Sequence, residues 1–130
     1  MQTKTRNMQT LEQWFSTLNR GDAVQSKEFF RSICTEDYKI HDPGMPEIEP
    51  GLTSYMVFFD EYMKGATDIK VVIEDMFETE EKVVTRATLN FLDTATNEKI
   101  KMMCIAISQF ENGKIKEEWQ ITAPLAEGSN

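Results

Sequence analysis

Histidine and cysteine are scarce in this sequence, which contains only His41, Cys34 and Cys104. One imidazole cannot supply the two or three histidines of the common zinc sites, so we expect no metal and no other cofactor. The two cysteines lie far apart in the chain and form no CxxC pair. We therefore expect free thiols, as in a protein of the reducing cytoplasm.

Basic residues are also few, because 14 lysines and arginines stand against 22 aspartates and glutamates, for a net charge of -8. A surface of this sign repels phosphate backbones and anionic lipids, so we expect no nucleic acid and no membrane surface as a partner. No apolar run approaches the roughly 20 residues of a membrane helix, and the first residues lack the apolar segment of a secretory signal. These features predict a cytoplasmic protein.

Proline and glycine are infrequent, with 4 and 6 residues, and the sequence has no repeat, linker or low-complexity tract. Hydrophobic residues make up 40% of the 130 residues, which is an ordinary globular composition at the commonest size of one domain. We predict a single domain over 1–130, with its core at about 8–122.

The first half of the chain has helical periodicity, since apolar residues recur at steps of three and four. We predict helices at 8–18, 24–33 and 52–63. Gly21 is placed to end the first helix, and Asp22 is placed to cap the second. Between the second and third helices, three prolines and two glycines predict a loop with a short strand at 38–41.

Beyond Gly65 the period changes from 3.6 to two, which is typical of strands. We predict four antiparallel strands, at 69–78, 82–92, 100–110 and 115–122. The dipeptide Asn112-Gly113 is the strongest short signal for a hairpin turn before the last strand. Helices followed by strands indicate an α+β fold, in which the helices cover one face of the sheet.

The strand predicted at 100–110 is apolar on both of its alternating sides, and no helix remains to cover the second side. We therefore expect a homodimer through the outer sheet face. The expected contact residues are Met103, Ile105, Ile107, Trp119 and Ile121. A strongly coiled sheet that folds over itself is the alternative.

Four stretches together resemble the SnoaL-like polyketide cyclase family of the NTF2-like superfamily. In chain order they are DYKIHDPG, GLTSYMVFFDEY, TDIKVVIEDMFETEEKVVTRAT and ISQFENGKIKEEWQ. The resemblance implies an NTF2-like (cystatin-like) cone, with N-terminal helices packed on a curved antiparallel β-sheet. It also implies a mainly apolar pocket inside the cone for a small molecule.

The resemblance further implies acid-base residues that this sequence lacks. In relatives that close polyketide rings, an aspartate follows the tryptophan of the last strand and a histidine lies on the adjacent strand; these positions hold Gln120 and Ala106 here. His41 and Asp42 are the remaining catalytic candidates, because an imidazole titrates near neutral pH and a nearby carboxylate would orient it. Asp75 is the next candidate base, provided that it shares the apolar side of its strand.

We expect Gln120 to hydrogen-bond a ligand carbonyl or hydroxyl, although it also suits a satisfied polar position on the sheet. The other expected substrate-binding residues are Trp14, Tyr38, Tyr55, Phe59, Tyr62, Met102 and Ala106. At helical spacing most such aromatic residues form core, and His41 with Asp42 equally suits a strand end followed by a turn.

The sequence leaves three functions open. The first is a pocket protein that acts on a small, mainly apolar oxygenated molecule by isomerase, cyclase or hydrolase chemistry. The second is a non-catalytic binding or carrier module, and the third is a protein-interaction subunit. Function does not follow from a fold, because sites are built onto it independently.

Overall fold

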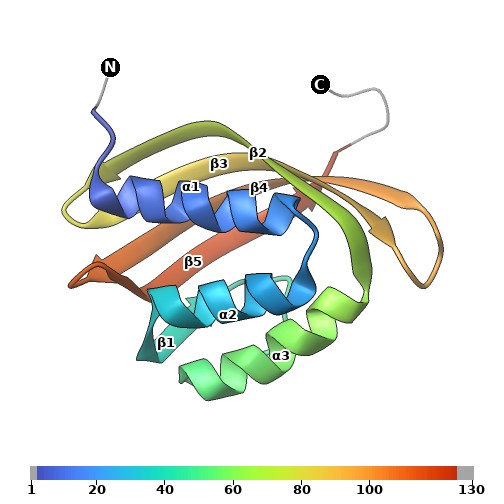
Figure 1. The fold of residues 1–130 in the computed structure, drawn as a ribbon, viewed down its shortest axis with the longest axis horizontal. Helices are drawn as coiled ribbons and strands as arrows, with labels where there is room; N and C mark the ends of the chain where they lie inside the picture. Colours follow the sequence, from blue (N-terminus) through green and yellow to red (C-terminus); the bar gives the residue numbers. More distant parts are fainter. Residues whose placement is uncertain (1–2, 126–130) are drawn as a thin grey trace.

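The computed structural model describes residues 3–125 as three helices on one side of a curved five-stranded sheet (Figure 1). The elements are α1 (Arg6–Asn19), α2 (Ala23–Ile33), β1 (Cys34–His41), α3 (Leu52–Lys64), β2 (Ala66–Thr79), β3 (Lys82–Asp93), β4 (Lys99–Glu111) and β5 (Lys114–Pro124). The strand order is β1-β5-β4-β3-β2. The predicted α+β arrangement and each of the seven main elements expected from periodicity are confirmed.

The sheet is mixed, whereas the sequence predicted an antiparallel one. The strands β2 to β5 pair antiparallel, but β1 pairs parallel with β5, with His41 opposite Trp119. The strand β1 also starts directly after α2, at Cys34, and is longer than predicted. A parallel pair needs a long connection, and here that connection runs through α3 and the other three strands. No local turn signal marks such a pair.

Caps and one glycine fix the helix starts. The side chain of Asp22 accepts a hydrogen bond from the backbone N–H of Gln25 at 3.0 Å, so the predicted cap of α2 is confirmed. Gly51 precedes α3 with φ of +117°, a value that favours glycine. Its N–H donates to the carbonyl of Tyr38 at 2.8 Å, which ties the start of α3 to β1.

The densest packing lies where all three helices meet the sheet. The rings of Trp14, Phe30 and Phe59 have centroids 4.9 to 5.9 Å apart, and Phe30 also meets Tyr38 edge-on at 5.5 Å. Trp14, Tyr38 and Phe59 are 7%, 1% and 6% exposed. Three of the expected substrate-binding residues therefore lie in the hydrophobic core.

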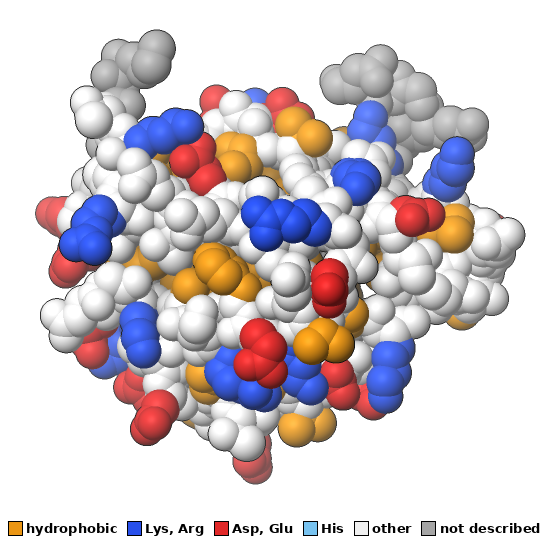
Figure 2. Space-filling view, viewed as in Figure 1, with side chains coloured by type: hydrophobic (Ala, Val, Ile, Leu, Met, Phe, Trp, Pro, Cys, Tyr) orange, Lys and Arg blue, Asp and Glu red, His pale blue; other side chains and the backbone are white. Residues whose placement is uncertain are grey.

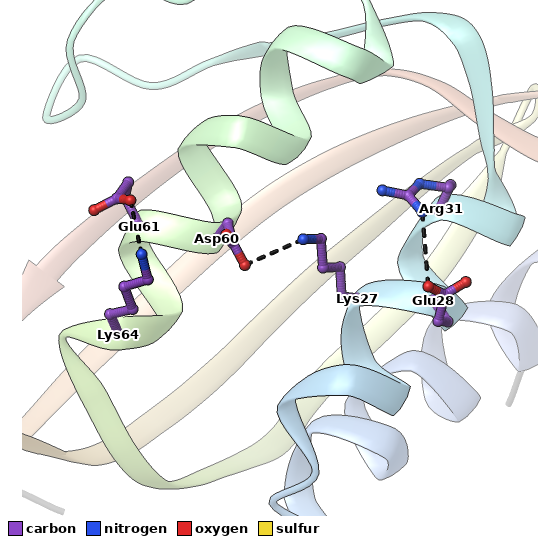
Figure 3. A network of polar contacts seen from close by, with 6 residues as sticks. All are labelled: Lys27, Glu28, Arg31, Asp60, Glu61 and Lys64. Carbon is purple, nitrogen blue, oxygen red and sulfur yellow. Dashed lines mark hydrogen bonds and ion pairs between the residues drawn. The ribbon is translucent and has the colours of Figure 1, made fainter.

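Ion pairs on the outside of the helices contribute less than this packing. Lys27 of α2 meets Asp60 of α3 at 3.2 Å, and each helix has one further pair of its own (Figure 3). Figure 2 shows that side chains of both signs are interspersed over this face. Exposed pairs each contribute about 0.2–1 kcal/mol, so the aromatic contacts dominate. None of the helices within residues 3–125 has the length and apolar composition that a membrane crossing requires.

The two faces of the sheet differ because successive strand residues point to opposite sides. The inner face, toward the helices, includes Met102, Cys104, Ala106, Ser108, Glu118 and Gln120 on β4 and β5. The outer face includes Ile105, Ile107, Trp119 and Ile121, which are 36% to 55% exposed. An apolar outer face is therefore present and open in the single chain.

Candidate functional site

The loop after β1 brings Asp42 against Gln120. The amide Nε2 of Gln120 donates to Oδ2 of Asp42 at 2.9 Å and lies 3.8 Å from the sulfur of Met45. The other carboxylate oxygen of Asp42 accepts the backbone N–H of Gly44 at 2.8 Å, which forms an Asx turn. Within residues 3–125 the carbonyl oxygen of the Gln120 amide has no hydrogen-bond partner, so it is available to a donor on a ligand.

His41 lies on the other side of the sheet from this pair. Its Nε2 is 2.6 Å from a carboxylate oxygen of Glu117, and its ring stacks on Trp119 with centroids 5.4 Å apart. Glu117 therefore has the orienting role that the sequence assigned to Asp42. The alternation of strand residues separates the two predicted catalytic neighbours, His41 outward and Asp42 toward Gln120.

A groove of about 670 Å³ lies along the outer face, between strands β4 and β5 and the loop 42–50. It is mainly apolar, and Pro43, Met45, Ile48, Ile105, Ile107 and Trp119 are among its lining residues. His41, Asp42 and Gln120 also line it. The sequence predicted a pocket inside the cone. On the inner side, a cavity of about 90 Å³ lies beside Tyr62 and Phe59.

The inner face carries a second carboxyl group, Glu118, which sequence reasoning missed. The hydroxyl of Tyr38 donates to one of its oxygens at 2.6 Å, and the hydroxyl of Ser108 donates to the other at 2.5 Å. Burial raises the pKa of Glu118, and the two hydrogen bonds oppose that shift. Strand alternation was the signal that could have found it, because Gln120 and Glu118 must share a face.

Three further titratable groups surround the two carboxyls. Burial, followed by the charge of Glu118, raises the pKa of Tyr55 and raises that of Cys104 to about 11. Burial, followed by the charges of Cys104 and Asp42, raises the pKa of Tyr62. These hydroxyl and thiol groups therefore remain protonated near neutral pH and can act as hydrogen-bond donors.

The inner-face groups are partly accessible. Tyr55, Met102, Cys104, Ala106, Glu118 and Gln120 are half-buried, and Tyr62 is 48% exposed. By contrast, Val83, Phe110 and Ile115, at the other end of the same face, are at most 2% exposed. The half-open part of the inner face therefore contains four expected ligand-binding residues besides Gln120.

The condition that made Asp75 a candidate base, a place on the apolar side of its strand, is not met. A bulge between Ile73 and Asp75 shifts the register of β2, and the Asp75 carboxylate lies on the surface, 2.6 Å from Arg86 Nη2. This residue is an exposed ion-pair partner. Both cysteines are unpaired, with Cys34 buried and Cys104 half-buried. Within residues 3–125, no three His, Cys, Asp or Glu side chains come together as metal ligands would.

Comparison with known proteins adds the family. The SnoaL-like domain matches residues 11–118, which is most of the chain. This protein belongs to the SnoaL-like family. No match was found among curated proteins.

Several solved structures resemble this SnoaL-like chain. One is a proposed SnoaL-like polyketide cyclase from Jannaschia sp. CCS1, with 16% identity, a TM-score of 0.78, and coverage of 94% of this chain and 91% of that one. Another is an NTF2-like protein of unknown function from Burkholderia pseudomallei K96243, with 15% identity, a TM-score of 0.76, and coverage of 90% of each chain. IdmH, a proposed polyketide cyclase from Streptomyces antibioticus, has 21% identity and a TM-score of 0.70. The match covers 91% of this chain and 92% of IdmH.

At these identities the likeness shows the fold alone. The predicted NTF2-like (cystatin-like) fold is thus confirmed, with a mixed sheet in place of the antiparallel one. Gln120 and Ala106, at the positions where the family resemblance implies aspartate and histidine, pair directly across β5 and β4. Neither can exchange a proton near neutral pH.

Proposed function

We propose that this SnoaL-like protein binds a small, mainly apolar oxygenated molecule on the half-open inner face and acts on it by acid-base chemistry of the isomerase, cyclase or hydrolase type. The hydrogen bond between Asp42 and Gln120 carries this proposal. It places an ionisable group from a loop and an amide from the sheet at one point of a partly accessible, largely apolar surface. Ligand sites combine apolar walls with a few such polar groups.

Each group has a role that its chemistry supports. Asp42 exchanges a proton with the ligand, since it is a carboxyl group in a loop beside this face. The free carbonyl oxygen of Gln120 accepts from a ligand hydroxyl. The hydroxyls of Tyr55 and Tyr62 donate to a ligand carbonyl, and Met102 supplies an apolar wall.

His41 gives the proposal a competing site in the outer groove. With Nε2 bonded to Glu117, the His41 Nδ1 has no hydrogen-bond partner within residues 3–125 and is available as a base. The groove also has a volume that suits a small molecule. A comparison of Asp42→Asn with His41→Gln shows which of the two groups is the base.

The test begins with displacement of a fluorescent hydrophobic dye by a panel of cyclic ketones and phenols, followed by product analysis of each binder. We expect Asp42→Asn to lower turnover by about 10²–10⁴-fold, the usual contribution of general acid-base assistance. His41→Gln should leave turnover unchanged. The opposite pattern, with His41 essential and Asp42 dispensable, would move the reaction to the groove and refute the inner-face site.

A carrier function is the second candidate, and Gln120 with Ala106 favours it, because both acid-base positions of the ring-closing relatives are filled by residues that cannot transfer protons. This candidate predicts stoichiometric binding without any product. Asp42→Asn would then change only affinity, by about 0.5–1.5 kcal/mol for one hydrogen bond.

We also propose that the protein is a homodimer through its outer face. Ile105, Ile107, Trp119 and Ile121 form an apolar patch there, and Lys39 and Glu117 supply charges of opposite sign. A face with both signs can pair with its own copy about a two-fold axis. A second copy would also cover the groove, which favours the inner face as the ligand site.

A further inference from the structure

Glu118 is the most unusual group on the inner face. Its two carboxylate oxygens each accept a hydroxyl hydrogen bond, from Tyr38 on β1 and from Ser108 on β4. Both supporting residues are 1% exposed, whereas Glu118 is half-buried. The carboxyl is therefore held in a fixed orientation by rigid neighbours, which is how reactive groups are positioned.

No cation among the described residues neutralises this carboxyl. Within residues 3–125, no lysine, arginine or histidine forms an ion pair with it. The titratable groups that feel its charge are Cys34 and Tyr38 of β1, Tyr55 of α3 and Cys104 of β4, all neutral acids. Asp42 adds a second negative charge, which acts on Tyr55 and Cys104. An unpaired carboxyl in such surroundings takes up a proton more readily than one in water.

We propose that Glu118 is a second proton-transfer residue of this site and that it takes the place of the aspartate missing at Gln120. The two positions are two steps apart on β5, with one residue between them, so they share the inner face at a spacing of about 6.5–7 Å. The inference rests on the proposed function, because a ligand must lie against this face to reach either carboxyl.

The reaction class is proton transfer to and from carbon or oxygen. In the base direction, a Glu118 oxygen forms a bond to the proton of a C–H next to a carbonyl. The electron pair of that C–H bond becomes the enolate double bond, and the carbonyl pair moves onto its oxygen. Return of the proton at another atom completes an isomerisation, with no oxidant or co-reactant. The hydroxyls of Tyr55 and Tyr62 are the nearby donors for the enolate oxygen.

A generic base probe, 5-nitrobenzisoxazole, tests this without knowledge of the natural ligand. The base removes the ring C–H proton, the freed pair forms the nitrile, and the N–O bond breaks with its pair on the phenolate oxygen. We expect the wild type to accelerate this elimination and Glu118→Gln to lower kcat/KM by about 10²-fold or more. Glu74→Gln, which removes the same charge from an exposed position on β2, should leave the rate unchanged.

Two variants that keep the Glu118 carboxyl test its role through the pH dependence of the rate. A purely structural role of Glu118 would not shift the midpoint of that pH dependence. Burial raises the pKa of Glu118 above its ordinary 4.5, and the rate should rise as the pH rises through this raised pKa. Tyr38→Phe and Ser108→Ala each remove a donor that favours the ionised form, so each should move the midpoint to higher pH. An unchanged midpoint in both variants would refute the role of the hydroxyl pair and with it the proposal.

The outcomes separate this inference from the function on which it rests. Methyl NMR signals of Met102, on the inner face, and Met103, on the outer, report where the probe binds. If the probe shifts only Met103 or neither, the inner-face function itself fails. If it shifts Met102 and is converted equally by wild type and Glu118→Gln, or is not converted at all, the site stands and Glu118 is not its base.

Discussion

Replacement of Gln120 by glutamate tests the contact on which the site is built. Glutamate has the shape of glutamine, so its second oxygen would occupy the place of the amide nitrogen, 2.9 Å from Oδ2 of Asp42. A donor would become an acceptor, and two carboxyl groups would face each other. Such a pair cannot remain fully ionised without a large cost, and it should share a proton instead.

The distance gives the size of the effect. Two unit charges 2.9 Å apart repel by about 1.4 kcal/mol at the dielectric constant of water and by about 6 kcal/mol at an effective value of about 20. Asp42 and Gln120 are both half-buried, so we expect a loss between these limits, about 2–4 kcal/mol, in the free energy of unfolding at pH 8.

The pH dependence follows from the direction of the shift. The new glutamate would have a folded-state pKa above its unfolded value of about 4.3. Below pH 4 both states carry the proton, so the repulsion adds nothing. As the pH rises through the folded pKa, the folded state loses the shared proton, and the full destabilisation appears above that value.

Urea unfolding at a series of pH values measures this. Gln120→Met is the matched control, because it removes the hydrogen bond at similar length without adding a charge. Gln120→Met should lower the free energy of unfolding by about 1.5–3 kcal/mol, the contribution of a hydrogen bond to a charged acceptor. This loss should vary much less with pH than the loss in Gln120→Glu. If the difference between the two variants stays constant from pH 4 to pH 8, the Asp42 carboxylate does not lie against position 120, and the site geometry is wrong.

Two further predictions concern the outer face and the thiols. In sedimentation equilibrium at micromolar concentration, the wild type should have the mass of a dimer and the Ile105→Glu variant that of a monomer. The control variant Val57→Glu, on the exposed side of α3, should remain dimeric. A monomeric wild type would contradict the interface. Thiol titration after denaturation should find two free thiols. In the native protein iodoacetamide should modify Cys104 before Cys34. Cys34 is 3% exposed, and burial raises its pKa above that of Cys104, which is about 11. Equal rates of modification would contradict this order.

The helices and hairpin strands were predictable because their signals are local. The apolar steps of α1, the cap at Asp22 and the Asn112-Gly113 turn each act over a few residues. The parallel pairing of β1 with β5 was not predictable in this way, since its register is fixed by contacts between residues about 80 positions apart. One of these contacts is the hydrogen bond from the hydroxyl of Tyr38 on β1, which is 1% exposed, to the carboxyl of Glu118 on β5.

The candidate site was partly predictable. Asp42 and Gln120 were found from the resemblance and their chemistry, and the structure brings them together. His41 and Asp42 have different partners, Glu117 and Gln120, because adjacent residues at the end of a strand point to opposite faces. Asp75 lies on the surface because a bulge of one residue in β2 reverses the faces beyond it, and composition does not reveal such a bulge.

The glutamine at position 120 is itself explained by the two carboxyls around it. Asp42 reaches this point because its Asx turn with Gly44 directs it there, and Glu118 is fixed on the same face by Tyr38 and Ser108. An aspartate at 120 would add a third negative charge to a face without a compensating lysine, arginine or histidine in the described chain. The neutral amide of Gln120 donates a hydrogen bond to Asp42. Glu118 then remains as the ionisable group of β5 on that face. The absence at 120 of the acid that the family resemblance implies is therefore compatible with proton chemistry on this face, because β5 has a carboxyl group two positions earlier.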